Sequence, residues 1–138
     1  MGRILAIDYG RKRVGIAVTD ELKMIANSLT TVHSKDIITF LKDYTEKESV
    51  ECFVIGEPKQ MNGKLSESEK FIKPFIKLLK KEFPDIKIER FDERFTSKIA
   101  VRTMIDAGIK KKDRQNKALI DSISATLILQ SYLESSKK

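Results

Sequence analysis

Residues 3–19 read RILAIDYGRKRVGIAVT, and this stretch decides how the fold begins. Two apolar runs, Arg3–Asp8 and Arg13–Thr19, are separated by a short polar segment that carries Gly10. This spacing predicts a β-hairpin, because two strands joined by a glycine-containing loop of about four or five residues pair antiparallel. Ser28–Val32 is a third predicted strand, so the chain is expected to open as an antiparallel meander.

Helices and strands are expected to alternate after the meander. Ser34 is predicted to cap a helix, and Glu51–Gly56 is apolar enough to be a strand covered on both faces. A capping box at Ser66–Glu69 predicts a second helix, in which Pro74 implies a kink or a split and which Pro84 ends. The remaining predicted elements are a strand over Asp85–Phe91, a short helix from Thr96 or Ser97 to Ala107, and a last helix from about Asp113 to Ser135.

Within Asp85–Phe91, the apolar Ile86, Ile88 and Phe91 are expected on one face, against Lys87, Glu89 and Arg90. The whole order is typical of an α/β fold, with a mixed sheet flanked by helices. Without an evident linker or repeat, residues 1–138 are predicted to form a single domain.

The composition limits the chemistry available to this chain. Hydrophobic residues make up 41% of the 138 residues, and there is one cysteine and one histidine. Cys52 and His33 cannot together form a zinc site of nitrogen and sulfur ligands, and a Ser-His-Asp site is improbable. Any acid–base or metal chemistry therefore rests mainly on carboxylates. Since no signal peptide or membrane helix is evident, a cytoplasmic protein without membrane contact is expected.

The net charge of +7 is unevenly distributed. Acidic and basic side chains nearly balance over residues 1–58, so the surplus lies in the rest of the chain. The densest basic patch is the segment Ile109–Lys117, which contains Lys110, Lys111, Lys112, Arg114 and Lys117. Such a patch attracts phosphate backbones, but it is equally typical of a solvated helix face.

Three carboxylates are placed where they could act together. Asp8 ends the first predicted strand, Glu93 follows the last one, and Asp121 lies among apolar residues of the final helix. Lys117 could compensate Asp121 as an i, i+4 partner. A divalent cation that prefers oxygen ligands, such as Mg²⁺, would compensate it better. Taken one at a time, these residues are also explained as a turn cap, a loop start and a helix ion pair.

Four groups of residues favour a shared functional site over these separate explanations. They are Asp8-Tyr9-Gly10 with Gly15; Gly56-Glu57-Pro58 with Met61-Asn62-Gly63; Asp92-Glu93-Arg94-Phe95-Thr96; and Asp121 with Ala125 and Ile128-Leu129-Gln130. In this order and over essentially the whole chain, they resemble the YqgF family, also described as RuvX-like pre-16S rRNA nucleases or Holliday junction resolvase-like proteins.

The resemblance implies an RNase H-like fold with a five-stranded mixed sheet whose first three strands are antiparallel. It also implies phosphodiester cleavage that depends on one or two Mg²⁺ or Mn²⁺ ions. The family's acidic positions match Asp8, Glu93 and Asp121, with Asp8 as the bridging ligand. Position 57 is commonly apolar in the family, so Glu57 is a departure and is expected as a rival to Glu93 or as a fourth ligand. Arg94 is expected to contact the scissile phosphate or to pair with Asp92.

The resemblance further implies a substrate of structured RNA or branched DNA. Processing of the 5′ end of pre-16S rRNA is the leading expectation. The alternatives are a Holliday junction resolvase, for which a symmetric homodimer would suit the cutting of two strands, and a catalytically impaired nucleic-acid binding protein. In either case the segment Ile109–Lys117 is expected to contact phosphates without reading sequence. An actin-like ATPase is excluded, because 138 residues leave no room for its second domain.

Overall fold

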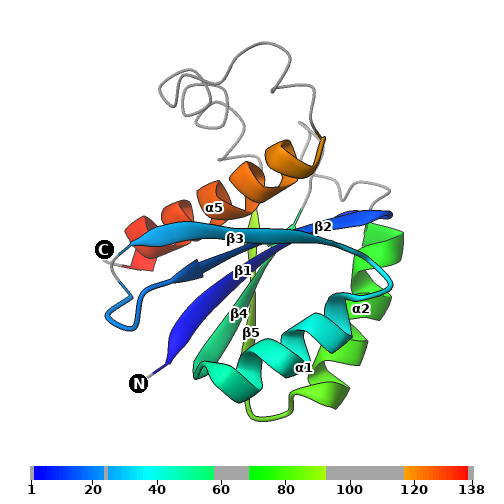
Figure 1. Ribbon diagram of the computed structural model, residues 1–138, viewed down its shortest axis with the longest axis horizontal. Helices are drawn as coiled ribbons and strands as arrows, with labels where there is room; N and C mark the ends of the chain where they lie inside the picture. The colour runs from blue at the N-terminus through cyan, green and yellow to red at the C-terminus, as the bar shows by residue number, and fades with distance from the viewer. Residues whose placement is uncertain (1, 24, 58–68, 93–116, 137–138) are drawn as a thin grey trace.

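The computed structural model describes residues 2–23, 25–57, 69–92 and 117–136, and in the last range the side chains of residues 124–134. These ranges form five strands and three helices (Figure 1). They are β1 (Arg3–Tyr9), β2 (Arg13–Thr19), β3 (Ala26–His33), α1 (Ile37–Lys47), β4 (Val50–Glu57), α2 (Glu69–Glu82), β5 (Lys87–Asp92) and α5 (Lys117–Ser136).

The strands form one mixed sheet in the order β3-β2-β1-β4-β5. Both pairs within the meander, β1–β2 and β2–β3, are antiparallel, whereas β4 and β5 add to the sheet in parallel. The backbone N–H of Gly10 donates to the carbonyl of Arg13 at 2.9 Å, which closes the hairpin. The expected five-stranded mixed sheet with an antiparallel beginning is confirmed.

Helices cover both faces of this sheet (Figure 1). The α1 and α2 helices pack on one face, in a core built from alternate residues of the strands that include Leu5, Ile7, Phe53 and Ile55. On the other face α5 packs against the residues in between. This second cluster contains Ile4, Ala6, Ala17, Cys52, Val54, Ala125, Ile128, Leu129 and Leu133. Side chains alternate along a β-strand, so each strand residue faces either the α1 and α2 side or the α5 side of the sheet.

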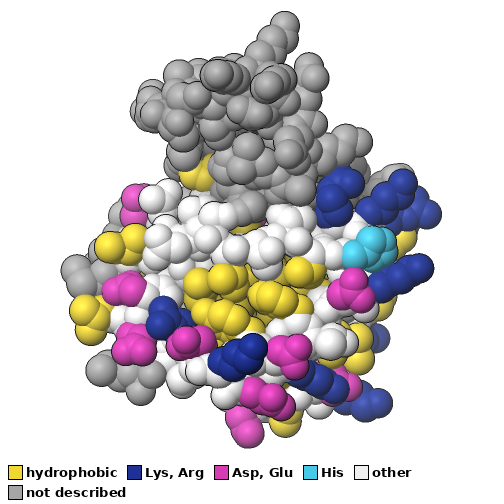
Figure 2. Space-filling view, in the orientation of Figure 1, with side chains coloured by type: hydrophobic (Ala, Val, Ile, Leu, Met, Phe, Trp, Pro, Cys, Tyr) yellow, Lys and Arg dark blue, Asp and Glu magenta, His cyan; other side chains and the backbone are white. Residues whose placement is uncertain are grey.

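Aromatic contacts organise the face under α1 and α2. Phe53 is fully buried and meets Phe83 edge-on, with ring centroids 5.4 Å apart. Tyr9, at the end of β1, stacks on Phe75 of α2 at 4.2 Å. At the front of the molecule hydrophobic side chains gather between β3 and α1 (Figure 2), where half-buried residues from both elements extend this cluster. Among the residues whose side chains are described, the cluster under α1 and α2 is the larger of the two.

The structure contradicts the expected cap of α1 and one of the two alternatives expected at Pro74. The residue that precedes α1 is Asp36, which makes no capping bond with its side chain. Ser34 instead donates through Oγ to the carbonyl of Arg11 at 2.8 Å, and so ties the β3–α1 connection to the tip of the first hairpin. Pro74 does not split α2, which runs from Glu69 to Glu82 as one helix. Pro74 lies early in the helix, so the backbone bond it removes is one to a carbonyl of the first turn.

The two faces of β5 also differ from the expectation. Ile88 packs with the α1 and α2 core, whereas Phe91 packs with the α5 cluster. Strict alternation therefore places Arg90, not Phe91, on the same face as Ile88. An arginine that faces a helix from inside a sheet needs a partner, and it finds one in α2.

Some expectations concern residues outside the described ranges. The predicted short helix over residues 96–107 and the capping residues before Glu69 belong to this group. Among the described residues, no helix is long and apolar enough to cross a membrane. Cys52 is buried in the α5 cluster, and burial raises the pKa of its thiol to about 11. A thiol held protonated in this way is a core residue, as its position in an apolar strand indicated.

We expect Phe53→Ala to lower the free energy of unfolding by about 3–5 kcal/mol, because the substitution leaves a cavity between the sheet and Phe83. Leu78→Ala is the control, since Leu78 on α2 is 42% exposed and its loss should cost less than about 1 kcal/mol. Urea unfolding followed by circular dichroism measures both. Equal losses in the two variants would contradict the assignment of Phe53 to the core centre.

Candidate functional site

The candidate site lies at the edge of the sheet where β1, β4 and β5 end. These three strands are parallel, so their carboxyl ends share one edge. Each of them carries an acidic residue in its last two positions: Asp8 in β1, Glu57 in β4 and Asp92 in β5. Loops at the carboxyl edge of parallel strands are where α/β proteins usually bind ligands. Asp8, Glu57 and Asp92 therefore lie along one edge of the sheet.

Asp8 lies on the face that α5 covers, because it continues the row of Ile4 and Ala6. Its neighbour on β2 is Gly15, and the register of β1 with β4 places Gly56 beside it on the other side. Neither neighbour has a side chain. The half-buried carboxylate of Asp8 is therefore flanked by bare backbone on both adjacent strands. Beside Asp8, these two strands therefore contribute no side chain on this face.

The α5 helix crosses this face and contacts β1, β2, β3 and β4. Ala125 is fully buried against the sheet, and its small side chain lets the helix approach closely. Asp121 precedes Ala125 by about one helical turn in α5. Tyr132, further along α5, donates a hydrogen bond to the carboxylate of Glu89 on β5. Bonds from Lys87 and then from Tyr132 hold the pKa of Glu89 below its ordinary value. The position of α5 over the sheet is thus fixed by both apolar and polar contacts.

Several predicted site residues lie outside the described part of the chain. For Lys117 and Asp121 the structure describes the backbone within α5 but not the side chains. Among the described residues, no group of three or more His, Cys, Asp or Glu side chains is arranged to hold a metal ion. The residues outside the described ranges are Glu93, Arg94, Lys110, Lys111, Lys112 and Arg114.

Glu57 is placed differently from Asp8. It continues the row of Phe53 and Ile55, which face α1 and α2. Its carboxylate forms an ion pair with Arg90, with Nη1 and Oε2 3.8 Å apart. The alternation of β4 thus directs Glu57 to the face opposite to that of Asp8. The role of Glu57 as a metal ligand stays a prediction, and the contact seen here is with an arginine.

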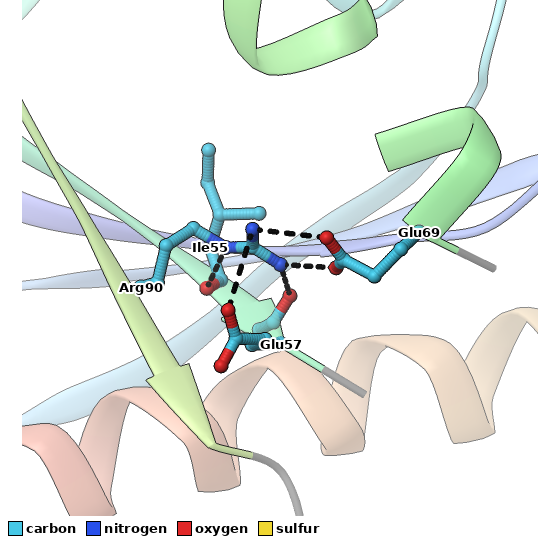
Figure 3. Close-up of polar contacts among 5 residues, drawn as sticks. Ile55, Glu57, Glu69 and Arg90 are labelled. Carbon is cyan, nitrogen blue, oxygen red and sulfur yellow. Dashed lines mark hydrogen bonds and ion pairs between the residues drawn. The ribbon is translucent and has the colours of Figure 1, made fainter. Parts of the chain in front are cut away.

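Arg90 is the centre of a polar network that reasoning from the sequence missed (Figure 3). Its guanidinium donates to the carbonyls of Ile55 at 3.3 Å and Gly56 at 3.0 Å, both at the end of β4. It also donates to both carboxylate oxygens of Glu69 in α2, at 2.5 and 3.3 Å. The side chain of Glu69 is only 5% exposed. Arg90 therefore fixes the last residues of β4 against the beginning of α2, directly beside the row that contains Asp8.

The loop between β1 and β2 adds positive charge next to Asp8. Arg11 and Lys12 are exposed, and Arg13 follows them at the start of β2. Backbone and side-chain bonds from Ser34 to the carbonyls of Lys12 and Arg11 hold this loop. The guanidinium of Arg11 lies over the ring of Phe71, 5.1 Å from its centroid. Figure 2 shows basic side chains gathered beside the single histidine, at this end of the molecule. Three consecutive basic residues in the first hairpin were the sequence signal for this cluster.

We expect Arg90→Leu to lower the free energy of unfolding by about 3–5 kcal/mol, because Glu69 would keep a buried charge without a partner. The double variant Arg90→Leu with Glu69→Leu should be less destabilised than the single variant, since it removes both charges. Urea unfolding measures each variant and the Glu69→Leu control. A double variant that loses as much as the two single changes added together would show that the pair is not coupled.

Comparisons with known proteins place nearly the whole chain in one family. A family model described as "RuvX: Holliday junction resolvase" matches residues 2–135. Three bacterial relatives, each named "Putative pre-16S rRNA nuclease", match nearly end to end. The protein of Bacteroides thetaiotaomicron is 61% identical over 99% of both chains, and that of Bacteroides fragilis is 60% identical over 99% of both. The protein of Flavobacterium psychrophilum is 62% identical over 96% of this chain and 97% of its own.

The family model covers nearly the whole chain, and the relatives exceed half identity over nearly their full length. The resemblance to the YqgF family is confirmed, and so is the five-stranded mixed sheet that it implied. The chain therefore belongs to the RuvX family, whose fold is RNase H-like.

Proposed function

We propose that this chain is a metal-dependent nuclease that hydrolyses phosphodiester bonds in precursor 16S ribosomal RNA. The observation that carries the proposal is the position of Asp8, at the carboxyl edge of the central strand and on the face under α5, between Gly15 and Gly56. The relatives that are 60–62% identical over their length carry the name of such a nuclease, which supports the choice of substrate.

The donor chemistry at this edge suits Mg²⁺ or Mn²⁺, because carboxylate oxygens are the ligands that these hard cations prefer. We assign Asp8, Glu93 and Asp121 to the metal site. Glu93 directly follows Asp92, the last residue of β5. Asp121 precedes the buried Ala125 by four residues, the spacing of one helix face. In this assignment Glu57 is not a metal ligand, and its carboxylate is paired with Arg90.

When bound, such an ion supplies charge neutralisation at the phosphate and a water of lowered pKa. The residues of the chain supply the geometry. Gly15 and Gly56 leave room for a phosphate beside Asp8, and Arg90 holds Gly56 in place through its carbonyl. Arg11 and Lys12 lie in the loop that follows Asp8 and attract the anionic backbone. A positioned phosphodiester and a positioned carboxylate are what hydrolysis at this edge requires.

We expect Asp8→Asn to lower the rate of metal-dependent cleavage by more than about 100-fold, because the loss of a direct ligand should exceed the effect of losing an outer-shell partner. The assay uses pure protein with labelled precursor 16S rRNA and with a labelled four-way junction, in Mg²⁺, Mn²⁺ or EDTA. Asp85→Asn is the control, since this exposed aspartate lies just before β5, at the opposite edge of the sheet.

The outcomes separate the candidate functions. Cleavage of the RNA that disappears in Asp8→Asn and persists in Asp85→Asn supports the proposal. Cleavage of the junction alone would favour the resolvase, which is the activity named in the family description. Binding without cleavage under every metal condition would identify an impaired nucleic-acid binding protein and contradict the nuclease. Cleavage that persists in Asp8→Asn would expose a contaminating nuclease.

We further assign phosphate contacts to the segment Ile109–Lys117, and Lys110→Glu with Lys111→Glu is expected to weaken RNA binding. Two lost contacts should reduce the slope of log affinity against log salt by about 1.4, at about 0.7 per phosphate on single strands. Lys47→Glu with Lys81→Glu carries the same change of charge on exposed positions of α1 and α2. An affinity and slope that match the wild type would remove this segment from the binding surface.

A further inference from the structure

A groove between α2 and β5 has no role in the site described so far. It encloses about 320 Å³ and is lined by Lys73, Ile76, Lys77, Lys80, Ile88 and Arg90. Four of these residues come from α2, and two come from the face of β5 that α2 covers. The groove therefore runs along the outer edge of the sheet, where β5 is the last strand.

Three lysines of the groove share one face of α2. Lys73, Lys77 and Lys80 are spaced by four and three residues, and all three are exposed. The ion pairs that described residues of this region form use other lysines, such as Lys42 with Glu82 and Lys87 with Glu89. The groove lysines thus keep their charges available. Their spacing presents a row of positive charge about 10 Å long, at 1.5 Å of rise per residue.

The floor of the groove is apolar. Ile76 and Ile88 are half-buried there, and the aliphatic stems of the lysines can lie along them. Arg90 contributes its side chain to the wall, but its charge is already used by Glu57 and Glu69. Free cations above an apolar floor suit a ligand that combines regular anionic groups with flat, weakly polar rings. A nucleic-acid strand has both, in its phosphates and in its sugars and bases.

Arg90 links the groove to the carboxyl edge of the sheet through its hydrogen bonds. Arg90 lines the groove and donates to the carbonyl of Gly56, and Gly56 is the residue of β4 that lies beside Asp8. A strand that leaves the cleavage edge would cross the end of β4 to reach the groove, because Asp8 and Arg90 lie on opposite faces of the sheet. Arg90 therefore contacts both the groove and Gly56, the neighbour of the proposed catalytic Asp8.

We infer that the α2–β5 groove binds the sugar–phosphate backbone of the RNA substrate beyond the bond that is cleaved. This inference rests on the proposed function and adds a second contact surface to it, distinct from the segment Ile109–Lys117. Phosphate contacts from lysines fix the register and direction of a strand but do not read its sequence. The groove therefore lets the protein hold single-stranded RNA outside the site and present one phosphodiester at the edge.

The test is equilibrium binding of a labelled single-stranded precursor RNA, measured by fluorescence anisotropy in EDTA over a series of KCl concentrations. The variant Lys73→Gln with Lys77→Gln removes two groove charges, and Lys47→Gln with Lys81→Gln removes two exposed charges elsewhere. We expect the groove variant to bind about tenfold more weakly at physiological salt, with its log–log salt slope reduced by about 1.4. The control variant should differ little from the wild type.

Two results would overturn the inference. Equal losses in the groove and control variants would mean that the effect is one of net charge, and unchanged binding in both would mean that RNA does not use the groove. An oligoglutamate of equal charge that binds as tightly, and with the same dependence on Lys73 and Lys77, would replace RNA by an acidic peptide as the ligand. Because the binding assay contains no metal, its failure is distinguishable from loss of cleavage, which the Asp8→Asn experiment measures.

Discussion

The interaction on which the carboxyl edge depends is the set of bonds that Arg90 makes with β4 and α2. A guanidinium has five donors in a rigid plane, and Arg90 uses them on two backbone carbonyls and on a carboxylate that is almost fully buried. The carbonyls belong to Ile55 and Gly56, the residues of β4 that precede Glu57. Because Gly56 lies beside Asp8, the same bonds that fix the end of β4 also define the surroundings of the proposed catalytic carboxylate.

The two faces of the sheet divide the acidic residues by task. Asp8 follows Ala6 on the face under α5, and Glu57 follows Ile55 on the face under α1 and α2. A shift of one residue along a strand moves a carboxylate from one face of the sheet to the other. On one face it lies under α5, the helix that contains Asp121, and on the other it lies beside Arg90. The carboxylate of Glu57 is paired with Arg90, whereas Asp8 lies between Gly15 and Gly56 on the face under α5. Burial and alternation therefore favour Asp8 over Glu57 as a ligand.

Much of the fold was predictable from periodicity, since the hairpin over residues 3–19 and the order of the described strands and helices along the chain follow from apolar runs and turn residues. The alternation within β5 was assigned incorrectly, so that residues were placed on the wrong face of the sheet. Grouping Phe91 with Ile88 hid the fact that Arg90 faces α2, although a strict count of two gives this result. The partners of Arg90 could not be found in this way, because Glu69 is 21 residues away and its distance depends on tertiary packing. Ser34 was misassigned for a similar reason, because its partner is a carbonyl of another turn.

The placement of basic residues follows from the same geometry. An acidic centre repels the phosphates on which it acts, so a nuclease of this kind needs positive charge nearby that does not neutralise the carboxylates themselves. In the described part of the chain that charge lies at the edges of the site. Arg11 and Lys12 extend from the hairpin on one side, and the row from Lys73 to Lys80 lies beyond β5 on the other. Arg90 lies between these two groups, and its own charge is paired with Glu57 and Glu69. Attraction of the substrate and stability of the site are thereby assigned to different cations.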